Sequence, residues 1–186
     1  MAPVAHMKEE ATMTTALMVF HDRLRLSRVN RALARRAACE DPGDVIVRDM
    51  YALYPDFRID VDEEHRVCGR ADRLAFLFPF YWYSAPALMK LWEDAVFTPG
   101  WAYGDGASIA GKRMLLAVTT GGAEGMYTAG GKHGATMEEL LLPYRTTARY
   151  LGLDYEEPFV VHGSSKTIDD DELARTAERF VRRLRG

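Results

Sequence analysis

The chain has 186 residues, of which 48% are hydrophobic and 27% are charged, and its formal net charge is −3. This length and composition predict one domain that buries a core without disulfides or a structural metal. The weak charge argues against a nucleic-acid-binding protein. The two cysteines, Cys39 and Cys68, form no metal-binding or redox motif, so we expect no metal site. Unpaired thiols and no signal-peptide pattern predict a cytoplasmic protein.

Apolar runs and helical patterns alternate along the chain. Residues 1–13 have no periodicity and are expected to form a disordered extension, so the predicted domain covers 14–186. Strands are predicted at 15–20, 45–47, 74–78, 114–118 and 158–161. Helices are predicted at 28–39, 61–70 (with Asp60 as N-cap), from Pro86 onward, at 136–151 and from Asp169 to the end. A glycine-rich excursion is expected at 98–111. This alternation predicts an α/β protein with a parallel sheet.

Ligands of such sheets bind at the carboxyl ends of the strands, so the loops after the first, third and fourth strands are the candidates. The first loop leads from His21 to a helix that opens at Ser27, Arg28, Val29 and Asn30. A helix N-terminus beside arginines suits a phosphate group. Alternatively, Ser27 is only an N-cap and the arginines are solvated. The sequence leaves both interpretations open.

Four consecutive aromatic residues, Phe80, Tyr81, Trp82 and Tyr83, follow the third strand. They either pack beneath the next helix, which this loop alone slightly favours, or form the wall of a flat aromatic cofactor.

The fourth strand ends at Thr119, Thr120, Gly121 and Gly122, and a glycine-rich loop continues to Gly134. Glycines allow a backbone to approach a ligand closely. Tyr127 and His133 lie in this loop and are candidates for proton donation or charge stabilisation. For an isolated pair, a surface tyrosine and a solvated histidine are the alternative.

Taken together, these segments resemble the flavodoxin-like NAD(P)H:quinone oxidoreductases. That family includes mammalian DT-diaphorase and the bacterial ancillary flavoproteins of glutathione-gated potassium efflux systems. Residues 50–61, 78–104, 111–122 and 158–163 are most similar to the bacterial proteins, and GMYTAGGKHG at 125–134 is more similar to the mammalian enzyme. The resemblance implies a three-layer flavodoxin-like sandwich whose five-stranded parallel sheet has the order 2-1-3-4-5. It also implies a homodimer that binds FMN; FAD is less favoured because the chain is short.

The resemblance assigns a role to each loop. The flavin phosphate would contact His21, Ser27, Arg28, Val29 and Asn30, and the ring edge would contact Phe80, Tyr81, Trp82 and Tyr83. The segment Thr119, Thr120, Gly121 and Gly122 would close over the ring, and Tyr127 and His133 would assist hydride transfer. One departure is Asp22, which stands where the family usually has proline and would place a carboxylate near a phosphate.

The implied activity is a ping-pong, two-electron transfer from NAD(P)H through the flavin to a quinone. The alternative is an ancillary regulatory subunit of a potassium efflux transporter, which would bring the protein to the inner membrane through that partner. A one-electron carrier of the flavodoxin type is the third interpretation. The mild charge and the pair Tyr127 and His133 argue against it.

Overall fold

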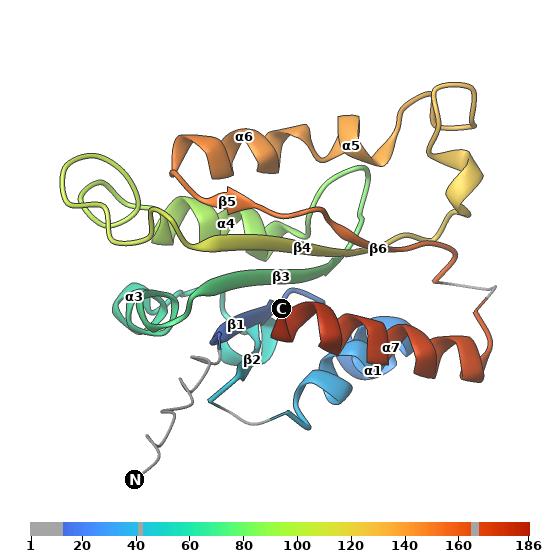
Figure 1. Ribbon diagram of the computed structural model, residues 1–186, viewed down its shortest axis with the longest axis horizontal. Helices are drawn as coiled ribbons and strands as arrows, with labels where there is room; N and C mark the ends of the chain where they lie inside the picture. The colour runs from blue at the N-terminus through green and yellow to red at the C-terminus, as the bar shows by residue number, and fades with distance from the viewer. Residues whose placement is uncertain (1–12, 41–42, 165–167) are drawn as a thin grey trace, which may run out of the picture.

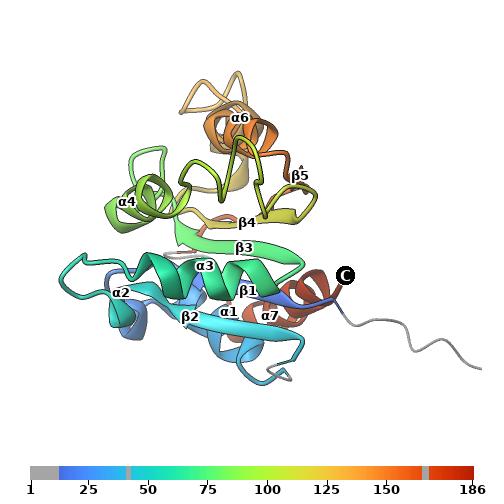
Figure 2. The same cartoon turned by 90° about the vertical axis from the view of Figure 1, so that its left-hand side faces the viewer.

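The computed structural model describes residues 13–40, 43–164 and 168–186. A twisted parallel sheet lies between two layers of helices (Figures 1 and 2). The predicted extension, apart from Met13, lies outside the described residues, as do two residues of the predicted break after the first helix, Asp41 and Pro42. Among the described residues, no helix combines the length and apolarity needed to cross a bilayer.

The sheet has the predicted strand order. It runs β2 (Val45–Asp49), β1 (Thr15–Val19), β3 (Arg73–Pro79), β4 (Arg113–Thr119), and then β5 (Asp154–Tyr155), with β6 (Phe159–Val161) also paired to β4. Every pairing is parallel. The fifth position was predicted as one strand at 158–161, but it is divided into β5 and β6. Pro158 has no N–H for the ladder, and it lies in the gap between them.

The two faces of the sheet bury separate cores. Leu17, Ala75 and Leu115 are in register and contribute to the core beneath α1 (Arg28–Ala37) and α7 (Asp170–Arg185). Their neighbours Met18 and Phe76 contribute to the opposite core. That core lies beneath α3 (Val61–Arg70), α4 (Ala87–Val96), α5 (Met137–Leu140) and α6 (Leu142–Tyr150). Because successive side chains of a strand alternate between faces, uniformly apolar strands supply both cores.

The predicted starts of the first helix and of the helix at 61–70 are confirmed, because Ser27 and Asp60 each accept a hydrogen bond from the backbone N–H three residues later. Asp169, predicted as the first residue of the last helix, is instead its N-cap and accepts from the Glu172 N–H. The first helix ends at Ala37 rather than Cys39, and Pro86 is the N-cap of α4 rather than part of its first turn.

The predicted helix at 136–151 is two helices, α5 and α6, which meet at Leu141. Pro143 lies in the first turn of α6, where its missing N–H is tolerated, whereas inside one continuous helix it would remove a hydrogen bond.

Short elements that the sequence did not predict lie near the carboxyl edge of the sheet. They are α2 (Met50–Leu53), η1 (Leu24–Leu26) and η2 (Glu124–Met126). The predicted excursion at 98–111 contains no helix or strand, and Trp101 within it stacks on His65 of α3 with ring centroids 3.8 Å apart. These segments add no further layer to the fold. Because the strands are parallel, the three loops that follow β1, β3 and β4 meet at one edge of the sheet, as predicted.

Candidate functional site

A cavity of about 480 Å³ opens where the loops after β1, β3 and β4 meet. The first turn of α1 forms one side of it, and the aromatic segment after β3 forms another. It is lined by His21, Leu26, Ser27, Arg28, Asn30, Pro79, Phe80, Tyr81, Thr119, Gly121 and Ser164. The structure therefore brings together most of the residues predicted for the cofactor. Those that do not line the cavity are Val29, Trp82, Tyr83, Thr120 and Gly122.

The start of α1 is tied to the end of β4 by Asn30. Its Nδ2 donates to Thr119 Oγ1 at 2.9 Å and to Ser27 Oγ at 3.2 Å, and Ser27 Oγ also accepts from the Asn30 backbone N–H. Oδ1 of Asn30 is buried and has no hydrogen-bond partner among the described residues. This acceptor suits a ligand hydroxyl, and the unbonded N–H groups of the first helical turn suit a phosphate.

His21 lies at the same end of the cavity as the start of α1, and its neutral ring can act as a hydrogen-bond donor. Its Nδ1 accepts the backbone N–H of Arg23 at 3.1 Å, so the neutral ring carries its proton on Nε2. Burial lowers the pKa of His21, and the attraction of Asp22 opposes this effect only in part. His21 can therefore donate a hydrogen bond to an anion at neutral pH without carrying a positive charge.

Two residues predicted to contact the phosphate, Arg28 and Val29, have side chains that are already engaged elsewhere in the protein. The guanidinium of Arg28 donates to the carbonyl of Ile168 and, at 2.6 Å, to the carboxylate of Asp170 at the start of α7. The side chain of Val29 is buried in the core beneath α1. Val29 can therefore contact a ligand only through its backbone.

The carboxylate of Asp22 is already engaged by protein groups. Its Oδ1 accepts the Tyr81 hydroxyl at 3.0 Å, and its Oδ2 lies 3.3 Å from Nε of Arg23. Burial and the bond to Asp22 together raise the pKa of Tyr81 to about 12. Asp22 thus links the first loop to the aromatic segment, and Arg23 offsets its charge.

The aromatic segment adopts an unusual backbone. Trp82 and Tyr83 have φ of 48° and 64°, in the left-handed region that bulky residues rarely occupy. Tyr81 and Ser84 close the turn with reciprocal backbone hydrogen bonds, and the Ala85 N–H donates to the Tyr144 hydroxyl of α6 at 2.8 Å. Trp82 is 92% exposed. Strained backbone of this kind is concentrated at binding sites.

Packing beneath the next helix, the alternative that this loop alone slightly favoured, is wrong for three of the four aromatics. Phe80 packs against the core, whereas Tyr81, Trp82 and Tyr83 are exposed.

A second group of predicted residues lies beside the cavity. The rings of Tyr127 and His133 are 4.6 Å apart, and His133 Nδ1 lies 3.2 Å from the Tyr83 hydroxyl. The ring centroid of His162 lies 5.2 Å from that of Tyr127, and His162 Nδ1 bonds Thr120 Oγ1 at 3.0 Å. The alternative of a solvated histidine is therefore wrong for His133, whose Nε2 is buried.

Gly122 is needed for this arrangement because of its close neighbours. A Cβ at Gly122 would lie 3.2 Å from Tyr127 Cε2 and from Met126 Sδ, and 3.3 Å from the Tyr127 hydroxyl. The glycine thus allows the phenol to lie against the segment that follows β4.

Sequence reasoning missed four residues of the site: Leu26, Pro79, His162 and Ser164. His162 and Ser164 follow β6, and the Ser164 N–H donates to the Thr120 carbonyl at 2.9 Å. Ligands of such sheets bind at the carboxyl ends of the strands, and this rule applies to the fifth strand position as well. It could therefore have directed attention to the segment that follows this strand.

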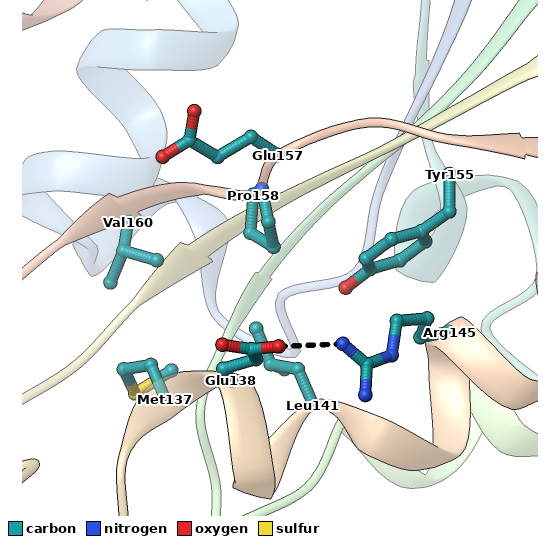
Figure 3. Close-up of a pocket in the computed structure, with 8 residues that line it drawn as sticks. All are labelled: Met137, Glu138, Leu141, Arg145, Tyr155, Glu157, Pro158 and Val160. Carbon is teal, nitrogen blue, oxygen red and sulfur yellow. Dashed lines mark hydrogen bonds and ion pairs between the residues drawn. The ribbon is translucent and has the colours of Figure 1, made fainter.

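A separate cavity of about 400 Å³ lies between α5–α6 and the β5–β6 edge (Figure 3). It is lined by Met137, Glu138, Leu141, Arg145, Tyr155, Glu157, Pro158 and Val160. The Glu138–Arg145 ion pair, 2.6 Å long, crosses one side of it. None of the residues predicted for the cofactor lines this cavity, and we assign no cofactor to it.

Comparison with known proteins places this geometry in a family. The profile of the Flavodoxin_2 family, described as a flavodoxin-like fold, matches residues 13–184. The chain belongs to this flavodoxin-like family. Its relatives include the uncharacterized NAD(P)H oxidoreductase YrkL of Bacillus subtilis (strain 168), which is 40% identical over 175 residues, covering 94% of this chain and 99% of YrkL.

Another relative is the glutathione-regulated potassium-efflux system ancillary protein KefF of Enterobacter sp. (strain 638). It is 44% identical over 141 residues, covering 75% of this chain and 78% of KefF.

Solved structures agree with the fold. General stress protein 14 of Treponema denticola, determined in complex with FMN, has a TM-score of 0.87 and 32% identity, covering 92% of this chain and 97% of its own. An NADPH-quinone reductase from P. pentosaceus has a TM-score of 0.82 and 26% identity, and the match covers 92% of this chain and 98% of the reductase. The flavodoxin-like fold predicted from the sequence is therefore confirmed.

Proposed function

We propose that this protein is an FMN-dependent NAD(P)H:quinone oxidoreductase. The observation that carries the proposal is the cavity that joins a helix N-terminus to the start of the aromatic segment, where Phe80 and Tyr81 line it. One end suits a phosphate and the other suits a flat ring. Relatives named as NAD(P)H oxidoreductases and a neighbour that holds FMN support the same assignment.

Each group of residues has a defined task in this proposal. The phosphate is bound by His21, Ser27, Arg28, the backbone of Val29, and Asn30. Phe80, Tyr81, Trp82 and Tyr83 contact the ring edge, and Thr119, Thr120, Gly121 and Gly122 close over the ring. FMN, when bound, supplies the two-electron hydride chemistry. The backbone N–H groups of Trp82 and Tyr83, which make no hydrogen bond among the described residues, and those of the glycine-rich segment would stabilise negative charge on it.

Tyr127 and His133 are proposed to stabilise charge and supply a proton to the quinone oxygen that receives negative charge. General acid catalysis requires a donor held in place beside that oxygen. Because NAD(P)H and quinone would use one site in turn, we expect ping-pong kinetics. Initial-rate plots with intersecting rather than parallel lines would contradict the shared site.

A homodimer is part of the proposal because apolar side chains are exposed around the cavity. Leu26, which lines the cavity, is 80% exposed, and Trp82, in the aromatic segment, is 92% exposed. A second copy that covers this surface would remove a large apolar area from water. Size-exclusion chromatography with light scattering tests this: a monomer at micromolar concentration would contradict it.

The direct test of function is spectroscopic. Protein mixed with FMN is expected to show flavin bands (~370 and ~450 nm) that bleach with anaerobic NADPH and return with benzoquinone. A one-electron reduced state that accumulates would favour an electron carrier instead. Failure to bind FMN would refute the proposal.

The phosphate assignment has its own control. Riboflavin, which lacks the phosphate, is expected to bind much more weakly than FMN. Ser27→Ala, which removes the cap of α1, is expected to weaken FMN binding about tenfold. Thr136→Ala removes the corresponding cap of α5 outside the cavity, and we expect it to leave FMN affinity unchanged.

A second function is favoured by the KefF relatives, which are named as ancillary proteins of a potassium-efflux system. We infer that this chain, a cytoplasmic protein in our proposal, is also a candidate regulatory subunit held at the inner membrane by such a transporter. Co-purification with the transporter would support this function, and its absence would leave only the reductase.

A further inference from the structure

The phenol of Tyr127 contacts two imidazoles. Its ring centroid is 4.6 Å from that of His133, with planes 41° apart, and 5.2 Å from that of His162, with planes 36° apart. Each imidazole is held by a hydroxyl at Nδ1: Tyr83 holds His133, and Thr120 holds His162. The two anchors come from different segments, the aromatic segment and the end of β4.

The hydroxyl of Thr120 determines where His162 carries its proton. This buried hydroxyl has one hydrogen, and Thr120 Oγ1 donates to the Gly122 carbonyl at 2.9 Å. Its oxygen must then accept from His162, which lies 3.0 Å away through Nδ1. The proton of a neutral His162 is therefore on Nδ1. Burial lowers the pKa of His162, which favours the neutral ring.

The hydroxyl of Tyr83 has the opposite effect on His133. The Tyr83 hydroxyl lies 3.2 Å from Nδ1 of His133, and when the phenol donates, that nitrogen is the acceptor. The neutral ring then carries its proton on Nε2. That nitrogen is buried and, within the described part of the chain, makes no hydrogen bond. A buried donor without an acceptor indicates a group that becomes satisfied when a ligand or a small movement of the loop supplies one.

We propose that Tyr83 and His162 are positioning residues for the pair Tyr127 and His133, and that the two imidazoles carry their protons on opposite nitrogens. His133 then carries a donor at Nε2–H and His162 an unprotonated Nε2, on two rings that both contact the phenol. The two rings therefore cannot exchange roles. The catalytic consequence rests on the proposed function, whereas the tautomers do not.

The tautomers are measured directly by two-bond ¹H–¹⁵N spectra of the full protein with ¹⁵N-labelled histidine. The chain has five histidines, so single His→Gln variants assign the signals. We expect the proton on Nδ1 for His162 and on Nε2 for His133. His21, whose Nδ1 accepts a backbone N–H, is the internal reference for the Nε2 form. The same tautomer at His133 and His162 would overturn the proposal.

Tyr83→Phe keeps the ring and removes only the hydroxyl. We expect it to shift the ¹⁵N signals of His133 toward a mixture of tautomers and to leave those of His162 unchanged. Tyr150→Phe is the matched control, because Tyr150 is exposed and its hydroxyl makes no hydrogen bond to any described residue. An unchanged His133 spectrum in Tyr83→Phe would remove the positioning role of Tyr83.

Kinetics separate positioning from simple support of the fold. We expect Tyr83→Phe and His162→Phe each to lower kcat for quinone about tenfold while the FMN dissociation constant and KM stay within about twofold. His162→Asn, whose amide can replace the Nδ1–H donor to Thr120, should recover part of the loss. Unchanged kcat in both Phe variants would refute the catalytic role. If the wild-type protein had no FMN-dependent activity, the proposed function would be refuted instead. The measured tautomers of His133 and His162 would still test this inference.

Discussion

Glu93 of α4 is a buried acid whose ionisation is expected to destabilise the folded chain. It is 8% exposed, and its Oε1 has no hydrogen-bond partner in the described part of the chain. The nearest cation is Lys90, with Nζ 3.6 Å from Oε2, but Lys90 also pairs with Asp94 at 2.5 Å. Burial therefore outweighs the attraction of Lys90 and raises the pKa of Glu93 to about 7.

The direction of the effect follows from the two pKa values. Glu93 titrates near 4.5 in the unfolded chain and near 7 in the folded one, so the unfolded chain loses its proton first as pH rises. Folding stability then falls between about pH 4.5 and pH 7 and stays reduced above it. At about 1.4 kcal/mol for each pKa unit, the ionised group costs about 3 kcal/mol at pH 8. Glu93→Gln removes this cost because the amide does not ionise.

Urea denaturation of the wild type and of Glu93→Gln at pH 4.5, 6 and 8 measures this cost. We expect the variant to be little changed at pH 4.5 and more stable by about 3 kcal/mol at pH 8. Asp94→Asn, at the adjacent exposed carboxylate, is the matched control and should show no comparable dependence on pH. A stability difference for Glu93→Gln that is the same at all three pH values would refute the reasoning.

Three further predictions concern the cavity. Gly122→Ala forces the Tyr127 phenol to move by a few tenths of an ångström, so turnover should fall about tenfold, whereas Gly125→Ala, with nothing within 4 Å of its Cβ, should leave it unchanged. Asn30→Ala breaks the link to Thr119, and FMN titration should show about tenfold weaker binding; unchanged affinity would argue against a role for Asn30 in the site. Asp22→Asn keeps an acceptor for the neighbouring tyrosine and removes a negative charge, so FMN should bind about threefold more tightly at low salt, with the gain lost at high salt.

The sheet was predictable because burial on both faces leaves a strong signal in sequence. The runs that became β1, β3 and β4 are apolar at nearly every position, and each is followed by a turn and then a helix. The caps Ser27 and Asp60 correctly predicted the residues at which α1 and α3 begin. A cap can be predicted because its side-chain oxygen accepts from a backbone N–H only three residues later in the sequence.

Features that depend on distant contacts were not predictable. The two residues of β5 form a strand only because they pair with Arg113 and Met114 of β4, since Asp154 and Tyr155 carry no apolar run of their own. The position of His162 after the fifth strand could have drawn attention to it, but nothing in the neighbouring sequence indicates its role. Its importance arises from Thr120 and Tyr127, which the fold brings to it from another strand end and another loop.

The aromatic segment shows why the sequence favoured the wrong alternative there. Pattern analysis weighs the apolar area of four aromatic rings, and that area predicts burial. Hydroxyl groups decide the outcome instead. The Tyr81 hydroxyl bonds Asp22, the Tyr83 hydroxyl bonds His133, and the Ala85 N–H bonds the Tyr144 hydroxyl.

These three bonds tie one short turn to the loop after β1, to the loop after β4 and to α6. A residue at positive φ costs of order 1–3 kcal/mol, and it persists only where surrounding contacts determine its position several times over. The three ties supply that determination for Trp82 and Tyr83. They also couple the geometry of the turn to the loops that follow β1 and β4. Loss of one hydroxyl is therefore expected to disturb the site more than loss of one exposed ring.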